Sequence, residues 1–257
     1  MARVRLDSLL AERGLFESRT RAAAAIIAGQ VHLGSGRRRA EKPGQLVDAE
    51  IELEVAGPPP YVSRGGIKLA NALDTLQVDV SGRHALDVGA STGGFTDCLL
   101  QRGAEHVVAL DVAYGELDYR LRADERVTVI ERTNARSITL DDLPFRPDLI
   151  VSDVSFISLT KVLPAVLACA ADVFDGLVMV KPQFEVGRER IGKGGVVRDP
   201  ALRREVVQDV ADAARAAGAA VMGSAPSALE GPSGNKETFL WLAEGSRPGA
   251  VDEVEAW

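Results

Sequence analysis

The chain has 257 residues, of which 46% are hydrophobic, enough for one large α/β domain or two unequal domains. No apolar run approaches the roughly 20 residues of a membrane-spanning helix. Residues 1–10 are charged and lack the apolar centre of a signal peptide. Two cysteines, Cys98 and Cys169, favour neither a disulfide framework nor a metal cluster. We therefore expect a cytoplasmic protein with buried cysteines, no bound metal and no membrane contact.

The net charge of −7 is unevenly distributed along the chain. Residues 1–42 contain nine Lys or Arg against four Asp or Glu, a net charge of +5, so that residues 43–257 carry −12. A basic segment joined to an acidic one is typical of a phosphate-binding module fused to another function. A solvated charged surface is the alternative interpretation.

The basic segment predicts a small α+β domain. Residues 6–12 indicate a short amphipathic helix, and Ser18 is a suitable N-cap for a second helix that ends at Gly29. A strand is expected over residues 31–33. Alternating apolar and acidic residues predict a second, half-exposed strand over residues 51–55.

The clearest break in the chain is Gly57 followed by three prolines. A proline run cannot continue a helix or a central strand, and it forms a stiff spacer. We place an N-terminal domain at residues 1–57, a linker at residues 58–62 and a second domain at residues 63–257.

The second domain alternates strand and helix patterns, which predicts a Rossmann-like α/β fold with a mostly parallel sheet. Strands are expected at residues 84–88, 107–112, 127–130, 149–152 and 176–180, helices at 95–102, 165–171 and 202–217, and a closing antiparallel pair at 219–227 and 237–242.

A glycine-rich turn follows the first of these strands, in the sequence LDVGASTGGF. Its glycine spacing differs from the Gly-x-Gly-x-x-Gly pattern that holds a pyrophosphate. A carboxylate precedes the turn, where it can receive a cationic amino acid group, and Asp111 ends the next strand, where it can accept hydrogen bonds from ribose hydroxyls. These features favour S-adenosylmethionine over NAD. The predicted cofactor-binding residues are Asp87, Gly89, Ala90, Ser91, Gly93, Gly94, Phe95, Asp111 and Val112.

The methyl acceptor is constrained by two absent motifs. The loop over residues 152–156 holds no cysteine, which argues against methylation at a pyrimidine C5. The Asn-Pro-Pro-aromatic loop that is typical of exocyclic amino methylation is also absent. A hydroxyl acceptor remains, and it needs a base or a cation that stabilises the forming alkoxide.

Four residues fit that requirement. Lys181 ends a strand after four apolar residues and should be partly desolvated. Asp153 ends the neighbouring strand, where it could lie between Lys181 and Lys68 and orient both. Two glycines before Lys68 suggest that a ligand approaches there. Glu237 opens a late strand that should return to the same sheet edge.

Residues 1–57 resemble the S4 RNA-binding domain. The matching features are Arg5-Leu6-Asp7 before the first helix, Ser18-Arg19 at the start of the second, and Gly29-Gln30-Val31 before the strand. The sequence departs from that family at Gly34-Ser35-Gly36, where an Asn-Gly pair is expected. The only aromatic residue is Phe16, so this domain should recognise shape and phosphates rather than stack on bases.

Lys68, Asp153, Lys181 and Glu237 resemble the Lys-Asp-Lys-Glu tetrad of the FtsJ/RrmJ-like ribose 2′-O-methyltransferases. The whole chain is similar to the TlyA family. This similarity rests on the tetrad, the S4-like N-terminal domain, the glycine turn and the segments around residues 152–156, 181–185 and 231–237. The resemblance implies 2′-O-methylation of cytidine in ribosomal RNA, of the 23S RNA and in some members also the 16S RNA, and an effect on sensitivity to ribosome-targeting peptide antibiotics.

The resemblance also implies roles for the tetrad. Lys181 would activate the hydroxyl, Asp153 and Lys68 would align it, and Glu237 would support Lys181 or the target ribose. We expect a monomer whose RNA contacts come from arginines of the N-terminal domain and of loops at the carboxyl edge of the sheet. These are Arg5, Arg19, Arg21, Arg37, Arg38, Arg39, Arg64, Arg132, Arg136 and Arg188.

Alternatives remain at this stage. A Rossmann oxidoreductase fused to an RNA-binding domain would bind NAD and leave the tetrad without a role. A non-catalytic RNA-binding or ribosome assembly factor would bind RNA without transferring methyl groups. A haemolysin-like protein would need a membrane-inserting segment, which the sequence lacks. Phe156 could stack on a flipped base or belong to the core.

Overall fold

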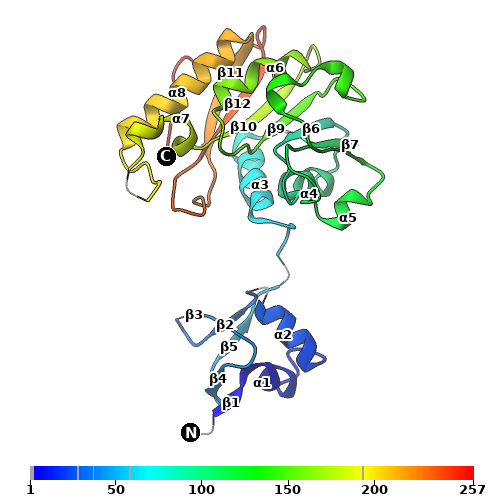
Figure 1. The fold of residues 1–257 in the computed structure, drawn as a ribbon, viewed down its shortest axis with the longest axis vertical. Coiled ribbons are helices and arrows are strands. Elements are labelled where there is room, and N and C mark those ends of the chain that lie inside the picture. The colour runs from blue at the N-terminus through cyan, green and yellow to red at the C-terminus, as the bar shows by residue number, and fades with distance from the viewer. Residues whose placement is uncertain (1–2, 28, 37, 58, 193) are drawn as a thin grey trace. The chain divides into compact units, whose positions relative to one another are not determined.

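The computed structural model describes residues 3–27, 29–36, 38–57, 59–192 and 194–257. The chain divides into two compact units, Met1–Pro60 and Tyr61–Trp257, which are called the head and the body below and are described separately (Figure 1). The division falls between Pro60 and Tyr61, among the residues that the proline run assigned to a linker. Of the predicted RNA-binding residues, Arg37 lies outside the described part of the chain.

The head packs two helices against two small sheets. Leu6, Leu10 and Ile26 from the helices are completely or almost completely buried in its core, together with Val31. The helices are α1 (Leu6–Glu12) and α2 (Arg19–Ile27); one sheet pairs β1 (Arg3–Arg5) with β4 (Leu46–Asp48), and the other has the order β3 (Arg38–Arg39), β2 (Val31–Leu33), β5 (Leu53–Val55).

Both predicted helices of the head are confirmed, and so is the strand β2. The prediction of a strand over residues 51–55 is wrong at its start. Residues 48–51 form a turn instead, in which Ile51 N donates to Asp48 O and Glu50 N donates to Asp48 Oδ1. The pair β1–β4 was missed because each strand has three residues, too few to show an alternating pattern.

The body is built on a seven-stranded sheet with the order β11-β12-β10-β9-β6-β7-β8. The five neighbouring strands β10, β9, β6, β7 and β8 are parallel to one another. The strand β12 pairs antiparallel with β10, and β11 pairs antiparallel with β12. The strands are β6 (His84–Val88), β7 (His106–Leu110), β8 (Val127–Ile130), β9 (Leu149–Ser152), β10 (Asp175–Val180), β11 (Ala219–Pro226) and β12 (Thr238–Glu244). The Rossmann-like fold and the closing antiparallel pair are confirmed.

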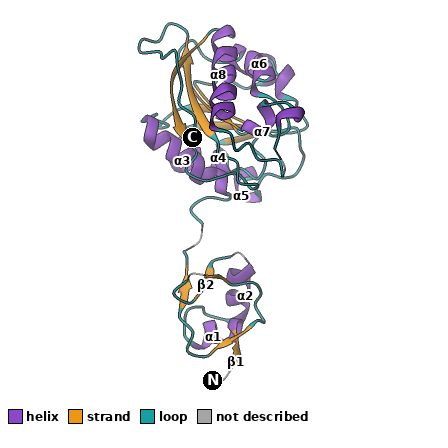
Figure 2. Cartoon of the chain, turned by 90° about the vertical axis from the view of Figure 1, so that its left-hand side faces the viewer, coloured by secondary structure: helices purple, strands orange, loops and turns teal. Residues whose placement is uncertain are grey.

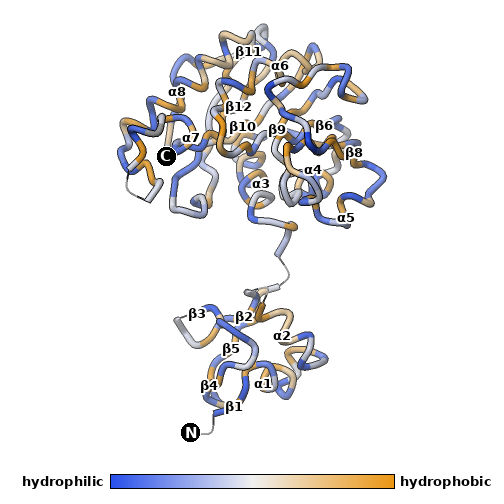
Figure 3. Tube along the Cα trace, in the orientation of Figure 1, coloured by the Kyte–Doolittle hydropathy of each residue, from blue (hydrophilic) through white to orange (hydrophobic). Residues whose placement is uncertain are grey.

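Helices cover both faces of this sheet (Figure 2). The core on one face contains residues of α3 (Arg64–Leu76) and α4 (Gly94–Gln101), and the core on the other contains residues of α6 (Leu163–Ala168) and α8 (Pro200–Ala216). Hydrophilic and hydrophobic segments alternate along α8 in Figure 3, as expected of a helix that buries one face. The shorter elements are α5 (Tyr119–Arg122), α7 (Pro182–Glu185) and the 3₁₀ turns η1 (Ala135–Ser137), η2 (Leu140–Asp142), η3 (Leu159–Lys161) and η4 (Arg188–Arg190).

The strand register brings the predicted site residues to one edge. Val88 and Val178 both pair with Ser152, so the residues that follow β6 and β9 leave the sheet side by side. Val180 pairs with Thr238, which places the start of β12 beside the end of β10. The reversal of strand order between β6 and β9 is the position at which open α/β sheets bind ligands.

Two further features differ from or extend the sequence predictions. The strand expected over residues 107–112 ends at Leu110, so that Asp111 and Val112 lie in the following loop. Among the described residues, no helix has the length and apolar character to cross a membrane.

Candidate active site

The turn after β6 begins with a completely buried carboxylate. Asp87 is 0% exposed, and its Oδ2 accepts hydrogen bonds from Thr96 N at 2.9 Å and Thr96 Oγ1 at 2.7 Å. Its Oδ1 has no hydrogen-bond partner among the described residues. Burial raises the pKa of Asp87 to about 7, and the charges of Asp153 and Asp111 add to the shift. A cationic group placed nearby would gain a partner and relieve this cost.

Two glycines give the turn its shape. Gly89 and Gly93 have φ of +86° and +94°, a region that side chains other than glycine rarely adopt. A Cβ on Gly89 would lie 3.1 Å from the carbonyl oxygen of Asp153, and one on Gly93 would lie 2.3 Å from Leu121 Cδ1. The glycines therefore let the turn pass closely between β9 and α5.

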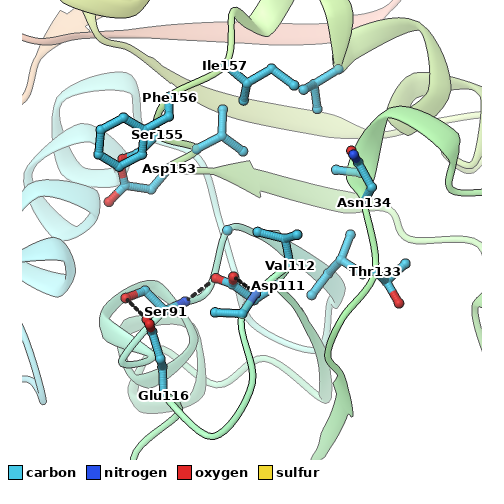
Figure 4. A pocket seen from close by; sticks show the side chains of 16 residues that line it. Ser91, Asp111, Val112, Glu116, Thr133, Asn134, Asp153, Ser155, Phe156 and Ile157 are labelled. Atoms are coloured by element: carbon cyan, nitrogen blue, oxygen red, sulfur yellow. Dashed lines mark hydrogen bonds between the residues drawn. The ribbon is translucent and has the colours of Figure 1, made fainter.

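Asp111 holds the turn from the loop that follows β7. Its Oδ2 accepts from Ser91 N at 2.7 Å, and its Oδ1 accepts from Ala113 N at 2.8 Å. Ser91 Oγ donates to Glu116 Oε2 at 3.1 Å (Figure 4). Each carboxylate oxygen can accept more than one hydrogen bond, so Asp111 keeps capacity for ribose hydroxyls while it fixes the loop.

These groups line a cavity of about 420 Å³. Ser91, Asp111 and Glu116 lie on one side of it and Asp153 and Phe156 on the other (Figure 4). Three more predicted cofactor residues, Ala90, Gly94 and Phe95, line an adjoining cavity of about 160 Å³, whereas Asp87 and Gly93 line neither cavity. Phe95 is also a core residue, since it is only 3% exposed.

The residues present fit S-adenosylmethionine. A free, buried oxygen on Asp87 suits an ammonium group, Asp111 suits a ribose, and the apolar parts of the larger cavity suit an adenine ring. In the described residues, no group of three or more His, Cys, Asp or Glu is arranged to hold a metal ion.

The four predicted catalytic residues meet at the next sheet edge as two separate ion pairs. Lys181 Nζ lies 2.6 Å from Asp153 Oδ1 and donates hydrogen bonds to Ser155 Oγ at 2.8 Å and to the carbonyl oxygen of Asp153 at 3.4 Å. Lys68 Nζ donates to Glu237 Oε2, and the two side chains are 8% and 1% exposed.

This pairing corrects one expectation. Asp153 was expected to lie between Lys181 and Lys68, and Glu237 was expected to support Lys181 or the target ribose. In the structure Glu237 binds Lys68 and Asp153 binds Lys181. The reason is that Glu237 precedes β12, next to the first turns of α3, where Lys68 points inward. Burial raises the pKa of Asp153, and the charges of Lys181 and Lys68 oppose the shift.

One of the two glycines before Lys68 has a role different from the predicted one. Gly65 and Gly66 lie in the first turn of α3, and a Cβ on Gly66 would lie 2.3 Å from the ring of Tyr61. Gly66 therefore permits a close packing contact rather than the approach of a ligand. Gly65 does line the cavities around the site.

A second large cavity, of about 750 Å³, opens over both ion pairs. All four tetrad residues line it, and Asp153 and Ser155 line this cavity and both cofactor-side cavities. The tetrad therefore lies between the space that fits the cofactor and a space large enough for a nucleotide.

Phe156 marks the rim between these spaces. Its side chain is 92% exposed, which excludes the core interpretation, and its ring centroid lies 5.1 Å from that of Phe184. Its φ is +63°, an unfavourable backbone conformation for an aromatic residue. Strain of this kind persists when the surrounding loop fixes it, and it is frequent at functional sites.

The predicted RNA-binding arginines of the body have different surroundings. Arg64 donates to the carbonyl oxygen of Glu230, and the Arg132 guanidinium lies 4.2 Å from the centroid of Tyr114. Arg136 is exposed. The backbone of Arg188 lies in η4, and its side chain is outside the described part of the structure.

In the head, Arg5 and Arg19 both bind Asp7, and the side chain of Arg39 packs against Gly29. Arg21 and Arg38 are exposed.

Sequence reasoning missed several residues of the substrate-side cavity. Gln183, Ser233 and Asn235 line it, and Gln183 Oε1 is buried without a hydrogen-bond partner in the described structure. Asn235 is 1% exposed and ties two loops together by accepting from Val197 N and donating to the carbonyl oxygen of Gly195. All three lie within the segments 181–185 and 231–237, which carry the family resemblance, and that was the available signal.

Comparison with known proteins agrees with this geometry. Residues 61–244 match the FtsJ-like methyltransferase family. The chain belongs to this family. It is 50% identical to the 16S/23S rRNA (cytidine-2′-O)-methyltransferase TlyA of Mycobacterium tuberculosis over 93% of its length and 90% of that protein.

Two further relatives cover nearly the whole methyltransferase. This chain is 44% identical to Bacillus subtilis YqxC, provisionally named an rRNA methyltransferase, over 98% of its own length and 90% of the length of YqxC. A solved Streptococcus thermophilus structure, provisionally named a hemolysin, superposes with a TM-score of 0.74 at 40% identity, covering 96% of this chain and 90% of that one.

The family assignment decides between the alternatives left by the sequence. The protein is an S-adenosylmethionine-dependent methyltransferase of the TlyA group, not an NAD-dependent oxidoreductase or a non-catalytic factor. The hemolysin name occurs within the same group of relatives.

Proposed function

We propose that this methyltransferase acts on the ribose 2′-hydroxyl of a cytidine in ribosomal RNA, with the 23S RNA as its first substrate and the 16S RNA as a second. The name of the Mycobacterium tuberculosis relative supports the choice of nucleotide and RNA. The chain acts as a monomer in this proposal, and its S4-like head supplies affinity for RNA.

The observation that carries the proposal is the position of the two ion pairs. Lys181, Asp153, Lys68 and Glu237 line one cavity, and Asp153 is shared with the cavities that fit the cofactor. A hydroxyl acceptor needs a proton-accepting group next to the reacting carbon, and no cysteine lines any of these cavities.

S-adenosylmethionine supplies a methyl group on a cationic sulfur, ready for in-line displacement. The chain positions the acceptor and removes its proton. The Lys181 amine takes up the proton of the 2′-hydroxyl as the methyl group is transferred, and the Asp153 carboxylate, 2.6 Å away, stabilises the ammonium that forms. Ser155 fixes the direction of Nζ through its hydrogen bond.

Lys68 and Glu237 shape the floor of the cavity. Because both side chains are almost completely buried and bound to each other, their positions are fixed before RNA arrives. The positive charge of Lys68 acts on Asp153 and limits the cost of keeping that carboxylate ionised. Such preorganisation is how buried polar groups assist a reaction without moving during it.

The target nucleotide must leave its helix to reach this cavity, because a ribose in a duplex cannot enter it. The exposed ring of Phe156 is a stacking surface for the flipped base. In this proposal, Arg64 at the start of α3, Arg132 after β8 and Arg136 in η1 contact phosphates.

The product of the reaction tests the proposal. Purified large and small ribosomal subunits that lack the modification are incubated with the methyltransferase and cofactor, and the RNA is digested to nucleosides for mass spectrometry. We expect 2′-O-methylcytidine from the large subunit. Methyl groups found only on bases, or no transfer to either subunit, would refute the assignment. Asp153→Asn is the matched inactive control, since it keeps the side-chain shape.

A further inference from the structure

The head contains a buried carboxylate that binds two exposed guanidinium groups. Asp7 in α1 is 3% exposed, while the side chains of Arg5 and Arg19 are 47% and 58% exposed. Arg5 precedes α1 and Arg19 begins α2, so one carboxylate joins the starts of two helices.

The hydrogen bonds to Asp7 fix both guanidinium groups. Arg5 Nε donates to Oδ1 at 3.1 Å and Arg5 Nη2 donates to Oδ2 at 2.8 Å, a two-point contact that sets the plane of the group. Arg19 Nε donates to Oδ2 at 3.1 Å. Ser8 N donates to Oδ1 at 2.9 Å and holds the carboxylate itself. A Cβ on Gly44 would lie 3.0 Å from Arg5 Nη1, so the backbone of Gly44 limits Arg5 on another side.

Much donor capacity remains after these contacts. A guanidinium has five N–H groups, and Asp7 engages two from Arg5 and one from Arg19. The other N–H groups of both side chains have no partner among the described residues of the head, and about half of each side chain faces solvent. The three groups together carry a net charge of +1.

An isolated ion pair at the surface would not need this arrangement. Exposed pairs contribute little stability, and burying a carboxylate costs free energy that its hydrogen bonds must offset. The Arg5 hydrogen bonds hold the pKa of Asp7 well below its usual range, so that the carboxylate stays charged at any working pH. What the carboxylate achieves is order, since two arginines that would otherwise repel each other are held side by side with their free edges outward.

We propose that Asp7 is the positioning residue of a phosphate-binding clamp, in which the free N–H groups of Arg5 and Arg19 bind one phosphodiester of the RNA backbone. Forked N–H groups match the oxygens of a phosphate, and fixing them beforehand lowers the entropy lost on binding. The arginines belong to residues 1–42, which carry a net charge of +5, while four acidic residues between positions 43 and 60 bring the whole head to +1. The positive charge is therefore concentrated in the segment that holds the clamp, which suits an RNA backbone. This proposal rests on the proposed function, because it names how the head holds its RNA.

The clamp makes a prediction opposite to that of net charge. Asp7→Asn makes the head more positive by one charge, so simple electrostatics predicts tighter RNA binding. If Asp7 orders the arginines, the same variant should bind deproteinised 23S RNA about 5-fold more weakly in 100 mM KCl, by filter binding with the full chain. The slope of log affinity against log salt should become less steep by roughly one phosphate contact.

Glu12→Gln is the matched control, because Glu12 is an exposed residue of the same helix and its replacement changes the charge equally. It should bind as tightly as the unmodified chain or more tightly. Equal behaviour of Asp7→Asn and Glu12→Gln would overturn the clamp.

A second substitution guards against unfolding of the head. Arg19→Lys keeps the charge but loses the guanidinium, and it should weaken RNA binding as much as Arg19→Ala. Unchanged binding by Arg19→Lys would show that a point charge suffices and would also overturn the clamp.

Kinetics separate positioning from a general structural defect. Asp7→Asn should raise the KM for large subunits and leave kcat unchanged, because the clamp does not touch the reacting atoms. A fall in kcat with unchanged KM contradicts the proposal. If the unmodified chain transfers no methyl group to ribosomal RNA but Asp7→Asn still weakens RNA binding, the proposed function fails and the clamp stands.

Discussion

Replacing Lys68 by methionine should separate the stability of the buried ion pair from its part in catalysis. The side chains of Lys68 and Glu237 are 8% and 1% exposed, so the substitution leaves a carboxylate buried without its cation. Removing one partner of such a pair costs about 3–5 kcal/mol, and for a domain of this size each kcal/mol lowers the melting temperature by roughly 2–4 °C. We therefore expect Lys68→Met to melt roughly 10 °C below the unmodified chain.

The double variant Lys68→Met with Glu237→Met should recover most of that loss. Replacing a whole buried pair by apolar side chains of similar volume is often neutral for stability. Methyl transfer should nevertheless stay about 100-fold below normal in the double variant, because the charge that acts on Asp153 is gone. Thermal melting followed by calorimetry and single-turnover transfer to large subunits measure the two effects.

Lys161→Met is the control, since Lys161 is an exposed lysine of the same domain and should change neither quantity. A double variant that melts as low as Lys68→Met would refute the argument about the unpaired charge. A double variant with normal transfer would remove Lys68 and Glu237 from the catalytic machinery.

Three further predictions concern the cofactor turn and the rim. The folded-state pKa of Asp87, about 7, exceeds that of an unfolded aspartate, so its contribution to stability is full below about pH 4 and is lost as the pH rises to 7. Between pH 5 and 7.5, the free energy of unfolding of the cofactor-free chain should therefore fall by about 2 kcal/mol relative to that of Asp87→Asn, measured by denaturant titration. A difference between the two proteins that does not change with pH contradicts this prediction. Gly89→Ala combines a φ of +86° with a Cβ 3.1 Å from the Asp153 carbonyl oxygen and should abolish cofactor binding in calorimetry, whereas Gly82→Ala, with φ of +70° and open space around it, should affect stability alone. Phe156→Ala should raise the KM for large subunits with a stability change under about 0.5 kcal/mol because the ring is exposed, and Phe156→Tyr should retain the normal KM; a normal KM for the alanine variant would remove the stacking role.

The body could be predicted well because its signals are local and strong. The buried strand β9 and the half-buried edge strand β8 are short, mostly apolar runs, so both were placed residue for residue. The carboxyl ends of such strands must share one edge, which located Asp153 and Lys181 beside the glycine turn.

Partners within the site could not be predicted from the same signals. Which carboxylate binds Lys68 depends on where α3 packs against the start of β12, a contact between residues 169 positions apart. The helix α3 was itself not predicted, because the two glycines in its first turn were interpreted as a place where a ligand approaches. The role of Asp7 also required coordinates, because its second partner, Arg19, belongs to another helix.

The central claim is that Lys181 removes the proton from the ribose hydroxyl, and the single-turnover rate of Lys181→Ala tests it most directly. With saturating cofactor and unmodified large subunits, we expect transfer to fall by about 1,000-fold while the Kd for S-adenosylmethionine changes less than about 3-fold. The reason is that Lys181 lines the smaller of the two cofactor-side cavities but not the larger one. Transfer to the same 2′-hydroxyl at a rate near that of the unmodified chain would contradict the account.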